Sequence, residues 1–228
     1  MLDNTAFPNV NGPTMARDAI KETRRIQLIE ATIDVIARAG FSDLTLAQVA
    51  ETARLSTGIV NFYFKSKDAL LAATLEHMVG EYRRYWRANV AAAGPGAAEK
   101  LVAMLEGDFG RLVCNRKTVT VWYAFWGETR WRPEFLKICQ QLSDSFHEET
   151  RDTFARLVTE GSYTNVDADL VARGFDAMID GLWLDMLINP KAVDRDGAKQ
   201  VVRTYLAGIF PNEFGRQSTG GAAKAATA

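Results

Sequence analysis

Apolar residues recur at intervals of three and four along almost every segment after Met15, and this spacing constrains the fold more than any other feature of the sequence. Such intervals place apolar side chains on one face of an α-helix, whereas the alternation that marks a half-buried strand is missing. Glycine, proline and asparagine interrupt the pattern, as at Gly94-Pro95-Gly96 and Asn189-Pro190. The chain is therefore predicted to be all-α.

Three short helices are predicted near the amino terminus. The first runs from Thr23 to Ala39, and the second, over 45–53, opens on the Thr45-to-Gln48 spacing of a capping box. The third runs from Ser56, a favourable N-cap residue, to Phe64. A tight turn at Arg54 joins the last two helices. This arrangement is typical of a helix-turn-helix, whose second helix enters the DNA major groove.

Longer helices fill the rest of the chain. One is predicted from Ser66 to about Ala93, and five more at about 97–114, 117–130, 133–160, 167–189 and 195–210. We expect a disordered arm over 1–16, a DNA-binding domain over 17–66, a ligand-binding and dimerisation domain over 67–213 and a disordered tail over 214–228.

Charge and cysteine content restrict the class of protein. The net charge is -1, yet residues 16–67 hold eight basic and six acidic residues, so the basic excess coincides with the predicted helix-turn-helix. Cys114 and Cys139 form neither a disulfide framework nor a zinc ligand set, and we interpret both as core thiols. No signal peptide begins the chain, and no run of ~18 apolar residues suggests a membrane span. A cytoplasmic protein with no membrane contact is expected.

Contacts to DNA are assigned by position and chemistry. The exposed residues of the third helix, Thr57, Gly58 and Asn61, are predicted to approach base edges. Phe62 is expected to pack in the core. Donors suited to phosphates flank this helix, with Arg54 open to the alternative of a solvated turn residue; they are Thr45, Arg54, Ser56, Tyr63, Lys65 and Lys67.

The stretch GFSDLTLAQVAETARLSTGIVNFYFKSKDALLAATL resembles the TetR family of transcriptional regulators. The resemblance implies an operator-binding homodimer, a small-molecule effector bound by the later helices, and a four-helix bundle formed by the last two long helices and those of a partner. One departure is Arg54, which stands where the family commonly has glycine. A left-handed backbone at a residue with a Cβ costs about 1 kcal/mol, which such a fold tolerates.

An aromatic cluster is the most informative part of the later helices. Trp122, Tyr123, Phe125, Trp126 and Trp131 lie within ten residues, and three of them share one helical face. Aromatic faces attract cations, so rings converging on a cavity suit a quaternary ammonium, and a carboxylate such as Asp108 or Glu128 would strengthen the site. The alternative is ordinary core packing.

The segments LEGDFG, TVWYAFWGE and AMIDGLWL resemble the TetR-type repressors that control synthesis of glycine betaine from choline. This second resemblance implies an effector that is choline or betaine aldehyde. The predicted ligand-binding residues are Tyr82, Trp86, Asp108, Phe109, Trp122, Phe125, Trp126, Glu128 and Trp183. Asp180 is either an anion partner or a capping or interface group. A regulator that senses a drug, an acyl thioester or a nucleobase is the alternative.

Sequence patterns of enzymes are missing. The chain has no GxSxG elbow, no phosphate-binding GxxxxGK[ST] loop and no HExxH pair. Its two histidines, His77 and His147, have no nucleophile near them in the sequence. We therefore expect a regulator without catalytic activity, metal or cofactor.

Overall fold

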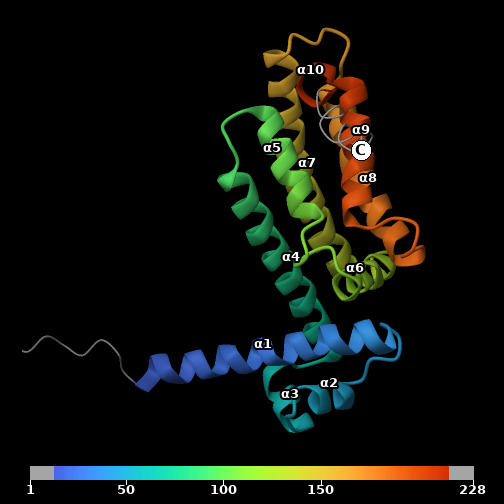
Figure 1. Cartoon of the computed structure of the whole chain (residues 1–228). Helices are drawn as coiled ribbons and strands as arrows, with labels where there is room; N and C mark the ends of the chain where they lie inside the picture. Colours follow the sequence, from blue (N-terminus) through green and yellow to red (C-terminus); the bar gives the residue numbers. More distant parts are fainter. Residues whose placement is uncertain (1–12, 216–228) are drawn as a thin grey trace, which may run out of the picture. The chain divides into compact units, whose positions relative to one another are not determined.

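The computed structural model describes residues 13–215, and over this range the backbone forms α-helices joined by short turns, with no strand (Figure 1). The predicted arm and tail fall mainly on residues 1–12 and 216–228, outside the described range. Helix α1 (Pro13–Ala39) begins ten residues before the predicted start at Thr23, so residues 13–16 of the predicted arm are helical. Proline suits a first helical turn, because the N–H that it lacks would have no partner there.

The chain divides into two compact units between Thr74 and Leu75. In the first unit, α1 packs against α2 (Leu46–Thr52), which packs against α3 (Thr57–Tyr63). The predicted capping box is present: the Thr45 hydroxyl accepts from the Gln48 N–H at 3.2 Å, and the Gln48 side chain accepts from the Thr45 N–H at 2.8 Å. The helix-turn-helix prediction is therefore confirmed in its bounds.

The turn between α2 and α3 adopts the strained conformation that its sequence predicts. Arg54 has a φ of 53°, in the left-handed region where glycine is favoured. The next residue, Leu55, donates its N–H to the Ala50 carbonyl at 2.8 Å, which closes the turn.

Helix α4 (Lys67–Ala92) contributes residues to both units. Leu70 and Leu71, in its first turns, are fully buried and belong to the first unit. The first compact unit therefore ends at Thr74, whereas the sequence suggests a domain boundary at residue 66.

The second unit contains the rest of the helices in the described range: α5 (Ala97–Asp108), α6 (Arg116–Glu128), α7 (Pro133–Glu160), α8 (Ala168–Ile188), α9 (Arg195–Ile209) and α10 (Pro211–Phe214). Helix α7 packs against α5, α6 and α8, and α9 packs against α8 (Figure 1). No helix among residues 13–215 has the length and apolarity needed to span a membrane.

Helix α5 ends at Asp108, six residues before the predicted end at 114. A turn follows, and it contains Gly110, where an added Cβ would overlap the Tyr85 hydroxyl. Asn115 then caps α6, accepting from the Thr118 N–H at 3.0 Å. This early end of α5 matters for the site, because it places Asp108 in the last turn of the helix.

Candidate functional site

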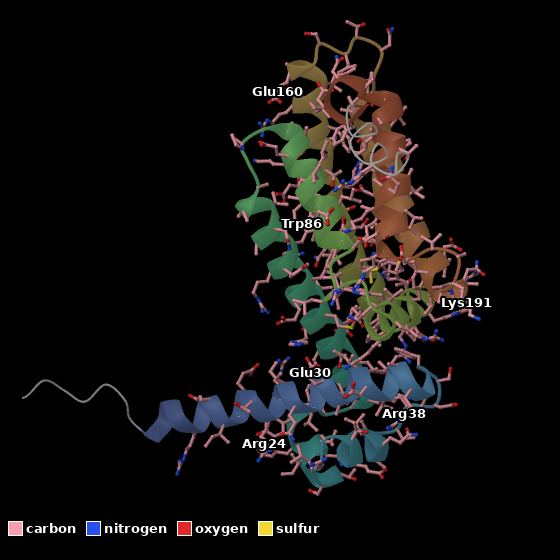
Figure 2. The ribbon with its side chains drawn as sticks, viewed as in Figure 1. Arg24, Glu30, Arg38, Trp86, Glu160 and Lys191 are labelled. Atoms are coloured by element: carbon pink, nitrogen blue, oxygen red, sulfur yellow. The ribbon has the colours of Figure 1, made fainter. Side chains whose placement is uncertain are left out.

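A cavity of about 330 Å³ lies inside the second unit, which is a size typical of small-molecule sites. Helices α4 to α8 supply its walls. Aromatic and acidic side chains dominate the lining; they are Tyr82, Trp86, Trp122, Trp126, Phe146, Phe175, Trp183, Asp108, Asp176 and Asp180. Four of the five tryptophans in the chain are among them. Figure 2 labels one of these, Trp86, on α4.

Tyr82 is the centre of the aromatic lining. Its ring lies 6.1 Å from Trp122 and 6.1 Å from Trp183, with both pairs edge-to-face, and 5.0 Å from Phe146. Aromatic pairs prefer such edge-to-face and tilted geometries. Trp126 extends the cluster, with its ring 6.0 Å from Trp122. The rings thus come from α4, α6, α7 and α8 and enclose one space.

Asp108 is the buried acid of the cavity, with only 3% of its surface exposed. Its carboxylate accepts from the Tyr82 hydroxyl at 2.5 Å, and its backbone carbonyl accepts from the Trp183 indole N–H at 3.0 Å. Burial raises the pKa of Asp108 to about 8, although the Tyr82 hydrogen bond opposes the rise. At neutral pH this carboxyl is mostly protonated, and a cation beside it would favour its ionised form.

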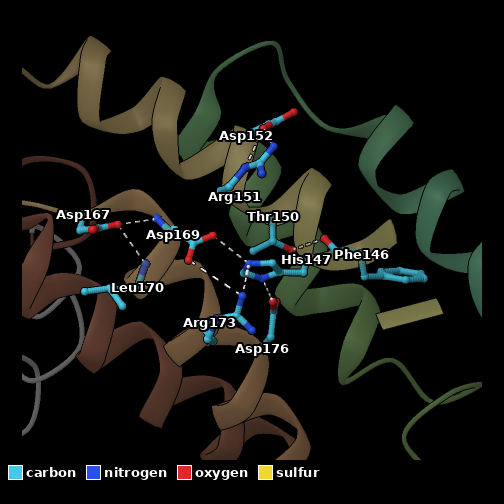
Figure 3. A network of polar contacts seen from close by, with 10 residues as sticks. All are labelled: Phe146, His147, Thr150, Arg151, Asp152, Asp167, Asp169, Leu170, Arg173 and Asp176. Atoms are coloured by element: carbon cyan, nitrogen blue, oxygen red, sulfur yellow. Dashed lines mark hydrogen bonds and ion pairs between the residues drawn. The ribbon is translucent and has the colours of Figure 1, made fainter. Parts of the chain in front are cut away.

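Asp176 lines the cavity and belongs to a polar network (Figure 3) whose member Arg173 is exposed. The His147 ring bonds to Asp176 through Nδ1 at 2.8 Å, and its Nε2 lies 3.1 Å from Asp169 and 3.2 Å from Arg173. Burial raises the pKa of Asp176, whereas the bond to Asp176 raises the pKa of His147. The network orients this carboxylate on the cavity wall.

Asp180 is the third acid, and it remains accessible to solvent. Partial loss of hydration among the surrounding protein atoms, together with the negative charge of Asp176, raises the pKa of Asp180 to about 6. No lysine, arginine or histidine is among the described residues that line the cavity. Of the three acids, only Asp176 has a basic side chain of the described range, His147, bonded to it, and aromatic faces with such acids form a site suited to an organic cation.

Six of the nine predicted ligand-binding residues line this cavity, and three do not. Phe109 and Phe125 are fully buried outside it, and the Phe125 ring packs edge-to-face on Phe135 at 5.4 Å. Glu128 forms an ion pair with Arg132 at 3.1 Å. Phe125 shares the predicted aromatic face, but that face is wide enough to serve both the cavity and the core.

Phe146, Phe175 and Asp176 line the cavity but were not predicted. Phe146 lies in a polar stretch of α7, yet Leu142, Phe146 and Thr150 follow one another at intervals of four and all line the cavity. That periodicity is a usable signal for one helical face. Nothing in the local sequence around Asp176 separates it from other acids of the same helix.

The predicted DNA-contacting residues gather on the first unit. Thr45 and Ser56 are the N-cap residues of α2 and α3, respectively, and Thr57, Gly58 and Asn61 are exposed on α3. Arg54 and Lys65 are also exposed, while Tyr63 is half-buried. Donors of both kinds, for phosphates and for base edges, are therefore available on α3 and its flanks.

Two residues of this region, Phe62 and Lys67, lie in surroundings that the sequence does not predict. Phe62, which is predicted to pack in the core, is 73% exposed, because Val60 and Phe64 occupy the inner face of the segment. Lys67 is half-buried and donates to the Leu44 carbonyl at 2.5 Å. Its ammonium therefore joins α4 to the loop before α2 and keeps two further donors.

Comparisons with known proteins agree with this architecture. Residues 28–74 match the model for bacterial regulatory proteins of the tetR family, and residues 97–211 match that for the BetI-type transcriptional repressor C-terminal domain. The HTH-type transcriptional regulator BetI of Escherichia coli K12 is 31% identical over 202 residues, covering 87% of this chain and 100% of the relative. BetI 1 of Chromohalobacter salexigens is 31% identical over 84% of this chain and 93% of its own.

Solved structures share the fold. A transcriptional regulator from Pseudomonas aeruginosa PAO1 superimposes with a TM-score of 0.75 at 27% identity, covering 86% of this chain and 94% of its own. A transcriptional regulator from Saccharomonospora viridis, in complex with choline, gives a TM-score of 0.74 at 23% identity, covering 81% and 96%. The chain belongs to the TetR family of transcriptional regulators and carries the C-terminal domain of its BetI-type repressors.

Proposed function

We propose that this repressor is a homodimer that senses choline or betaine aldehyde in the aromatic cavity and controls genes that convert choline to glycine betaine. The observation that carries the proposal is the lining itself: rings around Tyr82, three acidic side chains and no basic side chain among the described lining residues. It acts in the cytoplasm, where its operator DNA lies, and it acts as a regulator and not as an enzyme.

The chemistry of the lining fits a quaternary ammonium better than a neutral ligand. A trimethylammonium group has no N–H to donate, so it needs ring faces and nearby negative charge more than hydrogen-bond acceptors. The hydroxyl of choline or the carbonyl of betaine aldehyde needs a polar partner, and Gln140, Ser143 and Thr150 line the same cavity. Relatives named BetI and a similar fold with bound choline support this ligand class.

The proposed dimer interface lies on the outer faces of α8 and α9. Val202 and Leu206 of α9 are fully buried in the chain's own core. On the opposite face Val201 is 46% exposed, and on α8 Leu184 is 38% exposed beside the exposed Gly181. Small and apolar residues on two neighbouring helices suit a twofold four-helix bundle. Such a dimer would present two recognition helices to half-sites at least one DNA turn apart, ~34 Å.

We propose that α4 connects effector binding with release of DNA. One continuous helix carries Lys67, a predicted phosphate contact, and Tyr82 and Trp86 of the cavity. An effector shifts the DNA-binding equilibrium only through different affinities for the two states of the dimer. A cation that repositions Tyr82 relative to Asp108 would supply such a difference.

The first test is titration of intrinsic tryptophan fluorescence, because four indoles line the cavity. Choline and betaine aldehyde are compared with 3,3-dimethylbutan-1-ol, a neutral isostere of choline. They are also compared with glycine betaine, whose carboxylate the acidic lining would repel. We expect saturable quenching by the two cations and at least about tenfold weaker binding of the isostere, since a desolvated cation–π contact contributes about 2 kcal/mol. Equal affinity for choline and its isostere would contradict the proposal.

The second test asks whether the ligand acts on DNA. Sites selected in vitro from random DNA with the full chain are mapped to the genome, and complexes on them are followed by gel mobility with each ligand. We expect the protein to bind a palindromic site that lies beside choline-oxidising genes. Choline or betaine aldehyde should release the protein from this site. Sedimentation of Leu184→Arg should show monomers, whereas the exposed Leu112→Arg, in the turn before α6, should leave the dimer intact.

A further inference from the structure

Phe62 is an apolar ring exposed on the recognition helix. Its exposed fraction is 73%, whereas its near neighbours Val60 and Phe64 are 0% and 5% exposed. Single exposed apolar residues are common on protein surfaces, so exposure alone assigns no role. The position is the informative part: Phe62 follows Asn61 directly, on the short helix whose Thr57 and Gly58 are also exposed.

The surroundings of Phe62 leave its ring open. A Cβ built at Gly58 would meet only the Ser56 hydroxyl, at 3.7 Å, so the outer face of the helix is also open four residues before Phe62. Tyr63 supports the ring from one side, edge-to-face at 5.2 Å. Glycine on the outer face also allows the helix backbone to approach another molecule closely.

The chemistry of the ring limits what it can contact on DNA. Phenylalanine has no donor, so it cannot hydrogen-bond a phosphate as Tyr63 or Lys65 can. In the major groove the apolar group on a base edge is the 5-methyl of thymine. We infer that Phe62 is a specificity-determining residue that packs against a thymine methyl in each operator half-site. This inference rests on the proposed function, because it requires α3 to enter the major groove.

The test removes one methyl group at a time. An operator selected in vitro with the full chain is resynthesised with deoxyuridine in place of each half-site thymine, symmetrically in both halves. Fluorescence anisotropy then gives the affinity of the wild type, Phe62→Ala and Leu112→Ala, a matched control with an exposed leucine outside the first unit. Circular dichroism and thermal melting verify that each variant is folded.

We expect the wild type to lose affinity when deoxyuridine replaces thymine at one position of each half-site. Loss of one methyl contact should lower the operator affinity roughly fourfold when one half-site is substituted and about fifteenfold when both are. Leu112→Ala should keep this discrimination, and Phe62→Ala should bind thymine and uracil operators alike. Uniform wild-type affinity for all substituted operators, or discrimination that persists in Phe62→Ala, would overturn the inference.

Two further outcomes separate this inference from its foundation. Phe62 and Tyr63 of α3 line a groove together with Lys21 and Glu22 of α1. If Phe62 serves that groove, Phe62→Ala lowers the melting temperature and leaves the base preference unchanged, which contradicts the inference alone. Failure to select any DNA with the wild type, at low or high salt, contradicts the proposed function itself.

Discussion

The buried carboxyl of Asp108 should make effector binding depend on pH. Its pKa is raised to about 8, mainly by burial, and it lies on the wall of the cavity proposed to hold a cation. Choline does not titrate in this range, so a change in its affinity reports on the protein. A bound cation favours the ionised carboxylate, and by linkage a higher pH therefore favours the bound state.

The magnitude follows from the fraction of Asp108 that is ionised. With a pKa of about 8, this fraction rises about ninefold from pH 6 to 7, about fivefold from pH 7 to 8 and less than about twofold from pH 8 to 9. If the cation lowers the pKa by about two units, the affinity for choline rises about fivefold from pH 6 to 7, about fivefold from pH 7 to 8 and less than about twofold from pH 8 to 9. Asp180, with a pKa of about 6, adds a dependence only at the acidic end.

Calorimetric titration with choline at pH 6, 7, 8 and 9 measures this dependence. Asp108→Asn keeps an acceptor for the Tyr82 hydroxyl but cannot ionise, so its affinity should be weak and nearly flat with pH above 7. Glu106→Gln is a matched control, because Glu106 lies two residues away and pairs with Lys199 and Arg203 instead of lining the cavity. Wild-type affinity that is constant between pH 6.5 and 8.5, or a pH slope that survives in Asp108→Asn, would refute the reasoning.

Protein stability should show the opposite trend at the same residue. The pKa of Asp108 is higher in the folded state, so its contribution to stability is complete below its unfolded pKa and is lost as pH rises through about 8. Asp108→Asn should therefore melt above the wild type at pH 8, by an amount that shrinks toward pH 5. A variant that gains stability and loses the ligand response would identify Asp108 as a functional residue and not as a structural one.

Other variants test the cavity and the recognition helix separately. Trp126→Ala should weaken choline binding at least about tenfold and leave operator affinity unchanged, because its half-buried ring lines the cavity; loss of both would make Trp126 a core residue. Asn61→Ala should change the sequences selected from random DNA, and an unaltered consensus would remove Asn61 from the base contacts. Lys67→Ala should weaken all DNA binding alike and reduce the salt slope by about one, with some loss of stability because Lys67 also binds the Leu44 carbonyl.

Local chemistry explains why the helices could be predicted. The capping residues Thr45, Asn115 and Asp194 act on backbone groups within three residues, so their effects can be read directly from the sequence. Gly110 is the counterexample. Gly110 lies in the turn after α5 and packs against Tyr85, which lies twenty-five residues earlier in the chain. Because this contact joins two segments that are far apart in the sequence, periodicity alone could not predict where α5 ends.

The aromatic part of the cavity could be predicted only in part. The spacing of Trp122 and Trp126 places both on one face of α6, but Phe125 shares that face and packs into the core instead. The exposed position of Phe62 is a similar case, since a short helix has room for only two inward residues. Periodicity defines a face, and the neighbouring helices decide what each part of that face contacts.

By itself the sequence determined the all-helical class, the helix-turn-helix with its left-handed turn at Arg54, and membership of a known regulator family, because these depend on local backbone preferences and on contiguous motifs. Tertiary structure alone decided that Asp108, Asp176 and Asp180 share one cavity with rings from four helices. Residues up to a hundred positions apart meet there, and their pKa values depend on burial and on one another's charge. Such couplings arise from packing between helices, and no local pattern in the chain encodes them.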